Sequence, residues 1–250
     1  MDEYQNISTP KKGWSDKLTL PASIIIAGLL IGGGIYLNGQ MRDSRLSPTE
    51  VAKQSQTGGT AIRSVMRPVD ESDHTLGNPS ARVVIVEYSD TECPFCKVFH
   101  TTMNTLMKEY GGKGQVAWVY RHLPILDLHT KALKEAQALE CAAEVGGNSK
   151  FWEYANKVYE TTPSNDGLDL ALLPKIAGQV GLDAGEFNTC LESGSHLPKI
   201  QADAKNATDL GALGTPYSIL IDTKTQEYYP LEGAYTYIQL KQIIDLILES

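Results

Sequence analysis

The sequence Cys93-Pro94-Phe95-Cys96 constrains the fold of this chain more than any other feature, because it stands between a strand pattern and a helix pattern. Before it, the apolar run at residues 83–86 predicts a buried strand. After it, apolar residues recur every three or four positions, as on one face of a helix. These residues are Phe95, Phe99, Met103, Leu106 and Tyr110. The motif is therefore expected where a helix begins, with Cys93 at the N-cap, Pro94 in the first helical position and Cys96 one turn further on.

This position favours redox chemistry at the two cysteines. At a helix N-terminus, unpaired backbone N–H groups and the helix dipole favour a thiolate, and a second thiol one turn away allows thiol–disulfide exchange. The same spacing also occurs in half of a zinc site. However, the other cysteines, Cys141 and Cys190, form no second CxxC, and no two of the five histidines have the spacing of a zinc finger. We therefore expect a redox pair that needs no metal or other cofactor.

The first part of the chain carries a membrane signal. Residues 18–37 hold no charged side chain, and their length matches the roughly 20 residues that cross a bilayer. The alternative is a cleaved signal peptide, but the apolar run is long for one and no small-residue cleavage site follows it. We expect an uncleaved transmembrane anchor. The net charge of −8, without a basic cluster, gives no support for nucleic-acid binding.

The remaining chain is expected to divide into tails and one domain. Residues 1–17 would be a cytoplasmic tail, and residues 38–79, rich in Ser, Thr, Gly and Gln, a flexible tether. Because basic residues balance on the two sides of the anchor, orientation follows from chemistry: disulfide exchange needs an oxidising compartment outside the cytoplasm. Residues 80–250 are predicted to form an α/β domain interrupted by an all-helical insertion at about residues 125–213.

Four motifs resemble the DsbA-like thiol–disulfide oxidoreductases and occur in the order of that family. They are VEYSDTECPFC at 86–96, YRHLP at 120–124, FWE at 151–153 and GTP at 214–216. The resemblance extends from about residue 70 to the end of the chain. It implies a thioredoxin fold with an inserted helical domain, outside the cytoplasm of a bacterium, similar to the family's members with a single membrane span.

The resemblance also implies how substrates bind. Read alone, Thr215-Pro216 is an ordinary turn with a trans bond. In the family this proline is cis and packs against the CxxC, which leaves the backbone of Thr215 free to pair with an extended peptide. We expect Pro94, Phe95, Thr215 and Pro216 to contact substrate. Because Phe95 stands where the best-known member has histidine, the thiolate should be less stabilised and the protein a milder oxidant.

One acid near the motif is a candidate for proton transfer. Glu87 interrupts the apolar strand, where a charge is expensive to bury without a task. Either the strand ends there and Glu87 is solvated, or Glu87 matches the family's acid beneath the active site and accepts a proton from Cys96. The flanking charges Asp90, Glu92 and Lys97 are expected to be solvated.

The two cysteines outside the motif fall in predicted helices. In an oxidising compartment two free thiols would be a liability, so we expect a structural disulfide between Cys141 and Cys190. The alternative is two separately buried thiols that pack as small hydrophobic groups.

These expectations combine into one leading function. An extracytoplasmic enzyme would introduce disulfides into reduced or unfolded proteins, with Cys93 forming the mixed disulfide, and a quinone-linked membrane partner of the DsbB or VKOR type would reoxidise it. The alternatives are a disulfide reductase or isomerase, whose direction depends on the reduction potential, and a peptide-binding, chaperone-like module whose CxxC is not catalytic.

Overall fold

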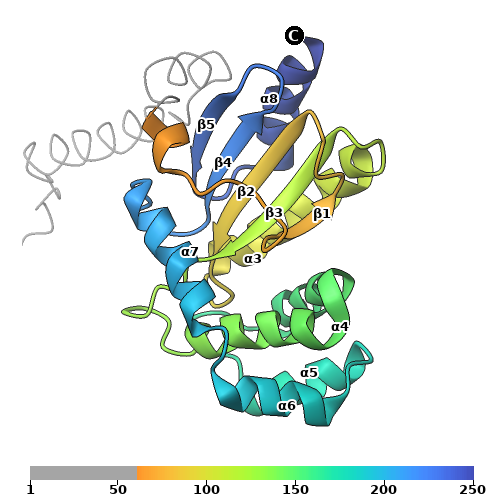
Figure 1. Ribbon diagram of the computed structural model, residues 1–250, viewed down its shortest axis with the longest axis vertical. Coiled ribbons are helices and arrows are strands. Elements are labelled where there is room, and N and C mark those ends of the chain that lie inside the picture. Colours follow the sequence, from red (N-terminus) through yellow and green to blue (C-terminus); the bar gives the residue numbers. More distant parts are fainter. Residues whose placement is uncertain (1–60) are drawn as a thin grey trace, which may run out of the picture. The chain divides into compact units, whose positions relative to one another are not determined.

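The computed structural model describes residues 61–250 (Figure 1). The predicted cytoplasmic tail, the anchor at 18–37 and the first part of the tether lie outside the described residues. Among residues 61–250, no helix combines the length and the hydropathy that crossing a membrane requires.

Five strands form one mixed sheet in the order β1-β3-β2-β4-β5 (Figure 1). The central strand β2 (Val83–Ser89) pairs in parallel with β3 (Val116–His122) and antiparallel with β4 (Tyr217–Asp222). At the edges, β1 (His74–Gly77) and β5 (Glu227–Glu232) pair antiparallel with β3 and β4. Every residue of β2, β3 and β4 is buried, as expected for strands covered on both faces.

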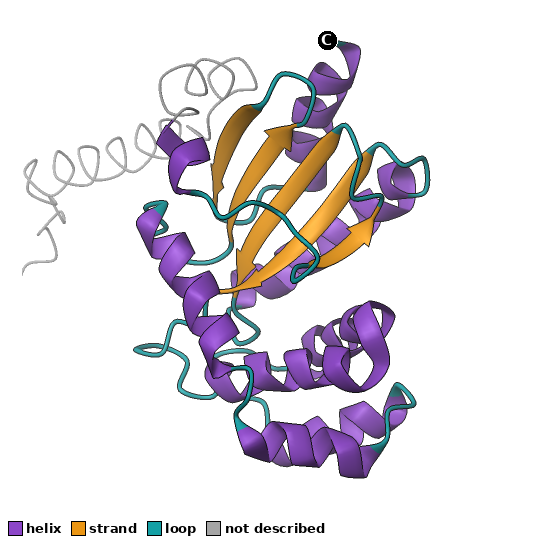
Figure 2. Ribbon diagram, viewed as in Figure 1, coloured by secondary structure: helices purple, strands orange, loops and turns teal. Residues whose placement is uncertain are grey.

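The alternating side chains of the strands divide between two hydrophobic cores. On one face, Ile85 packs in a core with α3 (Pro94–Leu106) and α8 (Tyr237–Glu249). On the other face, Val86 lies in a second core that α7 (Leu197–Asp209) closes. Figure 2 shows the sheet between these helices. This is the α/β arrangement that the apolar runs and helical periodicity predicted.

Between β3 and β4 the chain contains only helices and loops. The longest helix, α4 (Ala132–Thr161), is interrupted at Gly147, whose φ of 76° is left-handed and suits glycine. The short η2 (Leu170–Leu172) leads into α5 (Leu173–Gln179), and α6 (Ala184–Ser193) follows before α7. After α3, a single π-helical turn, η1 (Met107–Gly111), leads into β3.

The prediction of a flexible tether at residues 38–79 is wrong for the last part of that range, from residue 61 onward. Residues 61–65 form a helical turn, Met66 is 7% exposed in the second core, and β1 pairs with β3. The polar composition of this segment predicted that none of its side chains would be buried. The helical turn and β1 are nevertheless stable, because they contact residues that are far away in the sequence. The folded domain therefore begins at least as early as residue 61 and not near residue 80.

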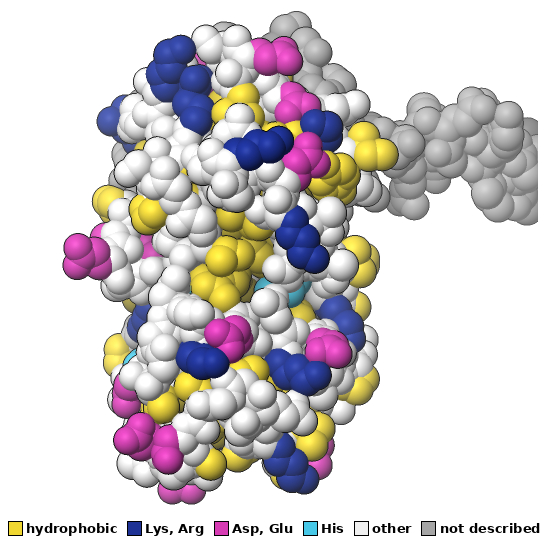
Figure 3. All heavy atoms as spheres, turned by 90° about the vertical axis from the view of Figure 1, so that its right-hand side faces the viewer, with side chains coloured by type: hydrophobic (Ala, Val, Ile, Leu, Met, Phe, Trp, Pro, Cys, Tyr) yellow, Lys and Arg dark blue, Asp and Glu magenta, His cyan; other side chains and the backbone are white. Residues whose placement is uncertain are grey.

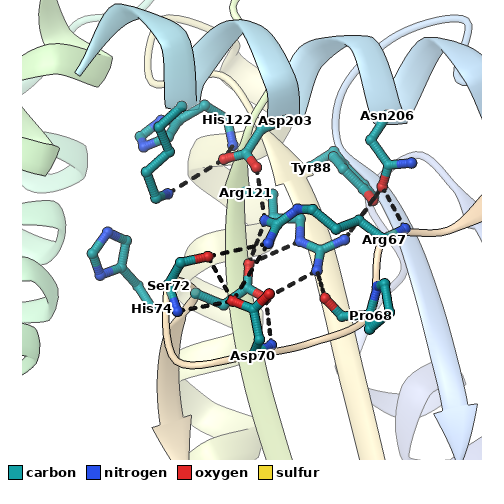
Figure 4. A network of polar contacts seen from close by, with 12 residues as sticks. Arg67, Pro68, Asp70, Ser72, His74, Tyr88, Arg121, His122, Asp203 and Asn206 are labelled. Atoms are coloured by element: carbon teal, nitrogen blue, oxygen red, sulfur yellow. Dashed lines mark hydrogen bonds and ion pairs between the residues drawn. The ribbon is translucent and has the colours of Figure 1, made fainter. Parts of the chain in front are cut away.

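A buried ion-pair network holds this segment in place (Figure 4). The carboxylate of Asp73 accepts two hydrogen bonds of 2.9 Å from the guanidinium of Arg121 in β3. It also accepts one of 2.7 Å from Arg67, which in turn donates to Asp203 of α7 at 2.9 Å. Arg121 further donates to the carbonyl of Pro68 at 3.0 Å. The segment 61–77 is thereby joined to the sheet and to α7.

One face of the molecule carries charges of both signs side by side. On the face drawn in Figure 3, Lys and Arg side chains are interspersed with Asp and Glu, and hydrophobic side chains gather in the middle. That face presents no continuous basic surface of the kind that binds nucleic acid.

Candidate active site

The CxxC motif lies where β2 passes into α3. Cys93 is the N-cap, with extended backbone angles of φ −76° and ψ 122°, and Pro94 opens the helix. The carbonyl of Cys93 accepts the first helical hydrogen bond, from the N–H of Lys97 at 3.1 Å. The predicted placement of the motif at the start of a helix is confirmed.

The two cysteines are free thiols in different surroundings. Cys93 is 5% exposed, and its Sγ lies 3.4 Å from the carbonyl oxygen of Thr215. A hydrogen bond from the Cys96 thiol lowers the pKa of Cys93 to about 6, and the Thr215 side chain and the N–H groups of Cys96 and Phe95 add to this effect against the burial of the thiol. Cys93 is therefore the thiol that ionises near neutral pH.

Cys96 is fully buried behind Cys93. Burial raises the pKa of Cys96 well above its usual value, and a thiolate at Cys93 and the charge of Glu87 act in the same direction. The N–H of Asp90 lies 3.5 Å from the Cys96 sulfur. Cys96 therefore stays protonated while Cys93 ionises, and it needs a proton acceptor when it reacts.

Glu87 lies in the centre of β2 and is fully buried. Its carboxylate accepts hydrogen bonds from Ser89 Oγ at 2.6 Å and from Trp118 Nε1 at 2.9 Å. Burial raises the pKa of Glu87 to about 7, although these two hydrogen bonds oppose the rise. Of the two readings of the sequence, the solvated strand end is excluded, because Glu87 lies inside the sheet.

A chain of hydroxyl groups extends from Glu87 toward the helical region. Ser89 Oγ lies 2.9 Å from the hydroxyl of Tyr159 in α4, which lies 3.0 Å from the hydroxyl of Tyr120. Burial raises the pKa of Tyr159 well above its usual value, and the charges of Tyr120, Cys96 and Glu87 act in the same direction. Sequence patterns did not reveal these partners, since only Ser89, two residues from Glu87 on the same strand face, has a local signal.

The loop before β4 completes the site. The Thr215–Pro216 peptide bond is cis, and the carbonyl of Pro216 accepts a hydrogen bond from the N–H of Gly233 at 2.9 Å. A shallow cavity of about 140 Å³ adjoins this loop, with Leu213, Thr215, Pro216, Tyr217 and Glu232 among its lining residues. Two large apolar side chains of this region face solvent: Phe95 is 65% exposed and Leu213 is 97% exposed.

The expectation that Asp90 and Glu92 are solvated is wrong. Asp90 is 2% exposed and accepts hydrogen bonds from the N–H groups of Glu92 and Ile125, both at 2.8 Å, and its carboxylate lies 2.9 Å from Nδ1 of His129. Lys97 is half-buried and donates to the carbonyl of Thr162 at 2.5 Å. These groups fix the loop that carries Cys93, and the local sequence could not show their partners.

Glu92, next to Cys93 in the sequence, is fully buried and anchors the loop after α4. Its carboxylate accepts hydrogen bonds of 3.2 Å from Thr162 Oγ1 and from the N–H groups of Gly167 and Leu168. The carboxyl of Glu135 in α4 is also fully buried, and burial, followed by the nearby carboxyl of Glu92, raises the pKa of Glu135 to about 9. Glu135 is therefore protonated at neutral pH.

The remaining cysteines, Cys141 of α4 and Cys190 of α6, are joined by a disulfide bond. Both are nearly fully buried, at 1% and 4% exposure. The bond connects two helices of the region between β3 and β4 and takes no part in the site around Cys93.

A family model described as "Thioredoxin" matches residues 70–245 of the chain. Among solved structures, DsbA2 of Pseudomonas aeruginosa is 27% identical with a TM-score of 0.60, covering 74% of this chain and 98% of that one. BdbD of Bacillus subtilis in its oxidised form is 21% identical with a TM-score of 0.64, covering 74% of this chain and 97% of that one, and shows the same fold.

Curated relatives are similar to the chain over part of their own length. The protein named Na(+)/H(+) antiporter NhaA 3 of Salinispora tropica is 34% identical over 175 residues, which are 69% of this chain and 25% of that protein. The chain thus spans about a quarter of the length of this relative, whose name describes the longer protein. With the family match and the fold together, the chain belongs to the thioredoxin family and is an oxidoreductase with the fold of the DsbA-type thiol–disulfide oxidoreductases.

Proposed function

We propose that this protein oxidises reduced or unfolded protein substrates by transferring its Cys93–Cys96 disulfide to them. The observation that carries the proposal is the contrast between the two thiols: the pKa of Cys93 is lowered to about 6, and that of the buried Cys96 is raised. A stabilised thiolate at Cys93 favours the reduced form of the enzyme, so that the disulfide is readily given up.

The exchange proceeds in two balanced steps. A substrate thiolate attacks the Cys93 sulfur of the enzyme disulfide, forming a substrate–Cys93 disulfide and breaking the Cys93–Cys96 bond. Cys96 leaves as a thiolate and takes up a proton, for which the buried carboxyl of Glu87, with its pKa of about 7, is the nearby source. A second substrate thiolate then attacks its own half of the mixed disulfide, and Cys93 leaves as a thiolate held at the helix N-terminus.

The run of exposed apolar groups beside Cys93 supports protein substrates. Phe95 and Leu213 face solvent, and the backbone of Thr215 borders the Cys93 sulfur. An extended peptide can place its cysteine on Cys93 while its backbone runs along Thr215 and Pro216. Pro94 and Phe95 contact such a peptide from the helix side.

We further propose that the domain works outside the cytoplasm of a bacterial cell, anchored by residues 18–37. The uncharged stretch of about a bilayer's width supports the anchor, and the need for an oxidising compartment supports the location. A quinone-linked membrane partner would accept the two electrons that each turnover leaves on Cys93 and Cys96.

The test is oxidative refolding of a reduced, unfolded protein with two disulfides. The oxidised chain is expected to transfer one disulfide per molecule, and Cys93→Ser to transfer none. In a separate incubation with the substrate in its disulfide form, the Cys93 thiolate of Cys96→Ser should attack a substrate disulfide and displace one of its thiols. Because no Cys96 thiol is present to resolve the product, a substrate–Cys93 adduct that reducing agents release should accumulate. Transfer by Cys93→Ser at the parental rate would refute the proposal.

A further inference from the structure

The sulfur atoms of the Cys141–Cys190 disulfide lie beside an imidazole and a carboxylate, in a second group of potential metal ligands away from the CxxC. His196, at the N-cap of α7, offers a ring nitrogen that lies with the two sulfur atoms inside a mutual distance of 4.8 Å. Glu144 of α4 adds a fourth group: its Oε2 lies 2.7 Å from His196 Nε2 and 3.6 Å from the Cys190 sulfur. Within residues 61–250, Cys141, Cys190 and His196 are the group of three such side chains whose donor atoms all lie within 4.8 Å of one another.

Solvent can reach this group. A cavity of about 660 Å³ opens beside it, and both Glu144 and Cys190 lie in its wall. The side chain of Glu144 is 52% exposed and that of His196 is 21% exposed. A small cation can therefore enter without unfolding of the helices that carry the group.

The four donors match the ligands of zinc. Zinc binds cysteine sulfur at about 2.3 Å, histidine nitrogen at about 2.0–2.1 Å and carboxylate oxygen at about 2.0–2.2 Å, with tetrahedral geometry. The disulfide blocks such a site, since only thiolates bind the metal. We propose that reduction of the Cys141–Cys190 disulfide creates a zinc site whose ligands are Cys141, Cys190, His196 and Glu144.

The conversion balances as a two-electron reduction followed by metal binding. An external dithiol reduces the bond to two thiols and becomes a disulfide itself. On binding Zn²⁺, Cys141 and Cys190 release their two protons, and Glu144 gives up its hydrogen bond to His196 for the metal. The distance between the two sulfur atoms increases by less than about 2 Å, from the length of a disulfide bond to the distance between two sulfur ligands of one tetrahedral zinc ion.

The consequence is a cross-link in both redox states. The disulfide connects α4 with α6, and zinc would connect the same two helices and the start of α7 through His196. If the Cys141–Cys190 disulfide is reduced in a thiol-rich environment, these helices would then stay cross-linked as long as zinc is bound. The site does not depend on the exchange chemistry of Cys93 and Cys96.

The test uses the full chain with Cys93→Ser and Cys96→Ser, so that the CxxC cannot bind metal. After reduction with a phosphine, Co²⁺ is expected to bind in one equivalent with the visible and thiolate charge-transfer absorption of a tetrahedral site, and Zn²⁺ to displace it. The oxidised protein should show neither band. His196→Ala and Glu144→Gln should each weaken Zn²⁺ binding at least about tenfold, whereas Glu186→Gln, which changes another acid of the same cavity, should not.

Two results would overturn the proposal. One is reduced protein that binds less than a tenth of an equivalent of Co²⁺, and the other is binding that His196→Ala and Glu144→Gln leave unchanged. If reduction alone unfolds the helical region, Zn²⁺ is expected to restore its circular dichroism, because the metal binds only the folded arrangement. Unfolded protein that zinc does not restore counts against the site equally.

Discussion

The Sγ atom of Cys93 lies 3.4 Å from the carbonyl oxygen of Thr215, although the two residues are 122 positions apart in the sequence. The start of α3 and the loop before β4 therefore meet at the reactive sulfur. Cys96 and Glu87 lie behind it, both fully buried. A substrate that reaches Cys93 therefore comes close to Thr215, while Cys96 and Glu87 are shielded from solvent.

Alkylation should separate the two thiols by pH. In the reduced protein, iodoacetamide is expected to modify Cys93 with a midpoint at about pH 6 and to leave Cys96 unmodified at neutral pH. Because the hydrogen bond from Cys96 is the largest cause of the lowered pKa, Cys96→Ala should move the midpoint upward. Peptide mass spectrometry reads out both results, and preferential modification of Cys96 would reverse the assigned roles.

Replacing Glu87 with glutamine should stabilise the protein and slow exchange. The folded carboxyl holds its proton up to about pH 7 and the unfolded one only to about 4.5, so stability falls as pH rises between these values. Glu87→Gln should therefore gain roughly 1–3 kcal/mol above pH 7 and nothing below pH 4. Turnover should drop about tenfold, since Cys96 loses its proton partner.

The control for this variant is Glu153→Gln, an exposed acid of α4 whose change should affect neither property. Urea denaturation at pH 5 and pH 8, with refolding assays at pH 7, gives both quantities. A Glu87→Gln protein with parental turnover would remove Glu87 from the proton path.

The apolar surface beside the site predicts an effect on substrate affinity. Leu213→Ser removes a side chain that is 97% exposed next to the Thr215 loop and should raise KM for a reduced peptide about three- to tenfold with kcat unchanged. The alkylation midpoint of Cys93 should stay the same. Leu246→Ser is the matched control. Leu246 is 51% exposed and lies toward the C-terminal end of α8, where Ser250 accepts a hydrogen bond from Arg82. Arg82 stands just before β2, so this region is at the opposite end of that strand from the CxxC motif. Equal KM values for both variants would argue against docking at Leu213.

The corrected start of the domain predicts a large loss of stability from one residue. Asp73→Ala leaves the fully buried guanidinium of Arg121 without its carboxylate and should destabilise the fold by about 3–5 kcal/mol. Asp70→Ala, which removes an exposed partner of Arg67 at 3.7 Å, should change stability by less than about 1 kcal/mol. Urea unfolding compares the two, and similar values would mean that the segment before β1 contributes little to the fold.

The parts of the fold that the sequence predicted correctly are those with local patterns. The apolar run of β2, the helical face from Phe99 to Leu106 and the two glycines before β3 are all visible within a few turns of chain. β1 was missed because its four residues, His74–Gly77, owe their strand form to pairing with β3. A polar segment this short has no hydrophobic periodicity from which a strand could be predicted.

The candidate active site likewise has parts that the local sequence predicted and parts that it did not. The placement of the CxxC follows from the strand and helix that flank it, whereas the sequence left the burial of Glu87 as one of two alternatives. The burial of Glu92 does not follow from the local sequence, because its hydrogen-bond partners Gly167 and Leu168 are 75 and 76 residues away. An isolated glutamate beside the motif looks like a surface charge until the loop that folds around it is known.

The most direct measurement is the reduction potential of the Cys93–Cys96 couple, obtained by equilibrating the protein with glutathione and separating its redox forms. Thioredoxin, with a cysteine pKa near 7, has a potential of about −270 mV, and DsbA, with a pKa near 3.5, has one of about −120 mV. With the pKa of Cys93 lowered to about 6, we expect a potential between these two values. A potential at or below that of thioredoxin would contradict the proposed oxidase function and make the protein a reductant.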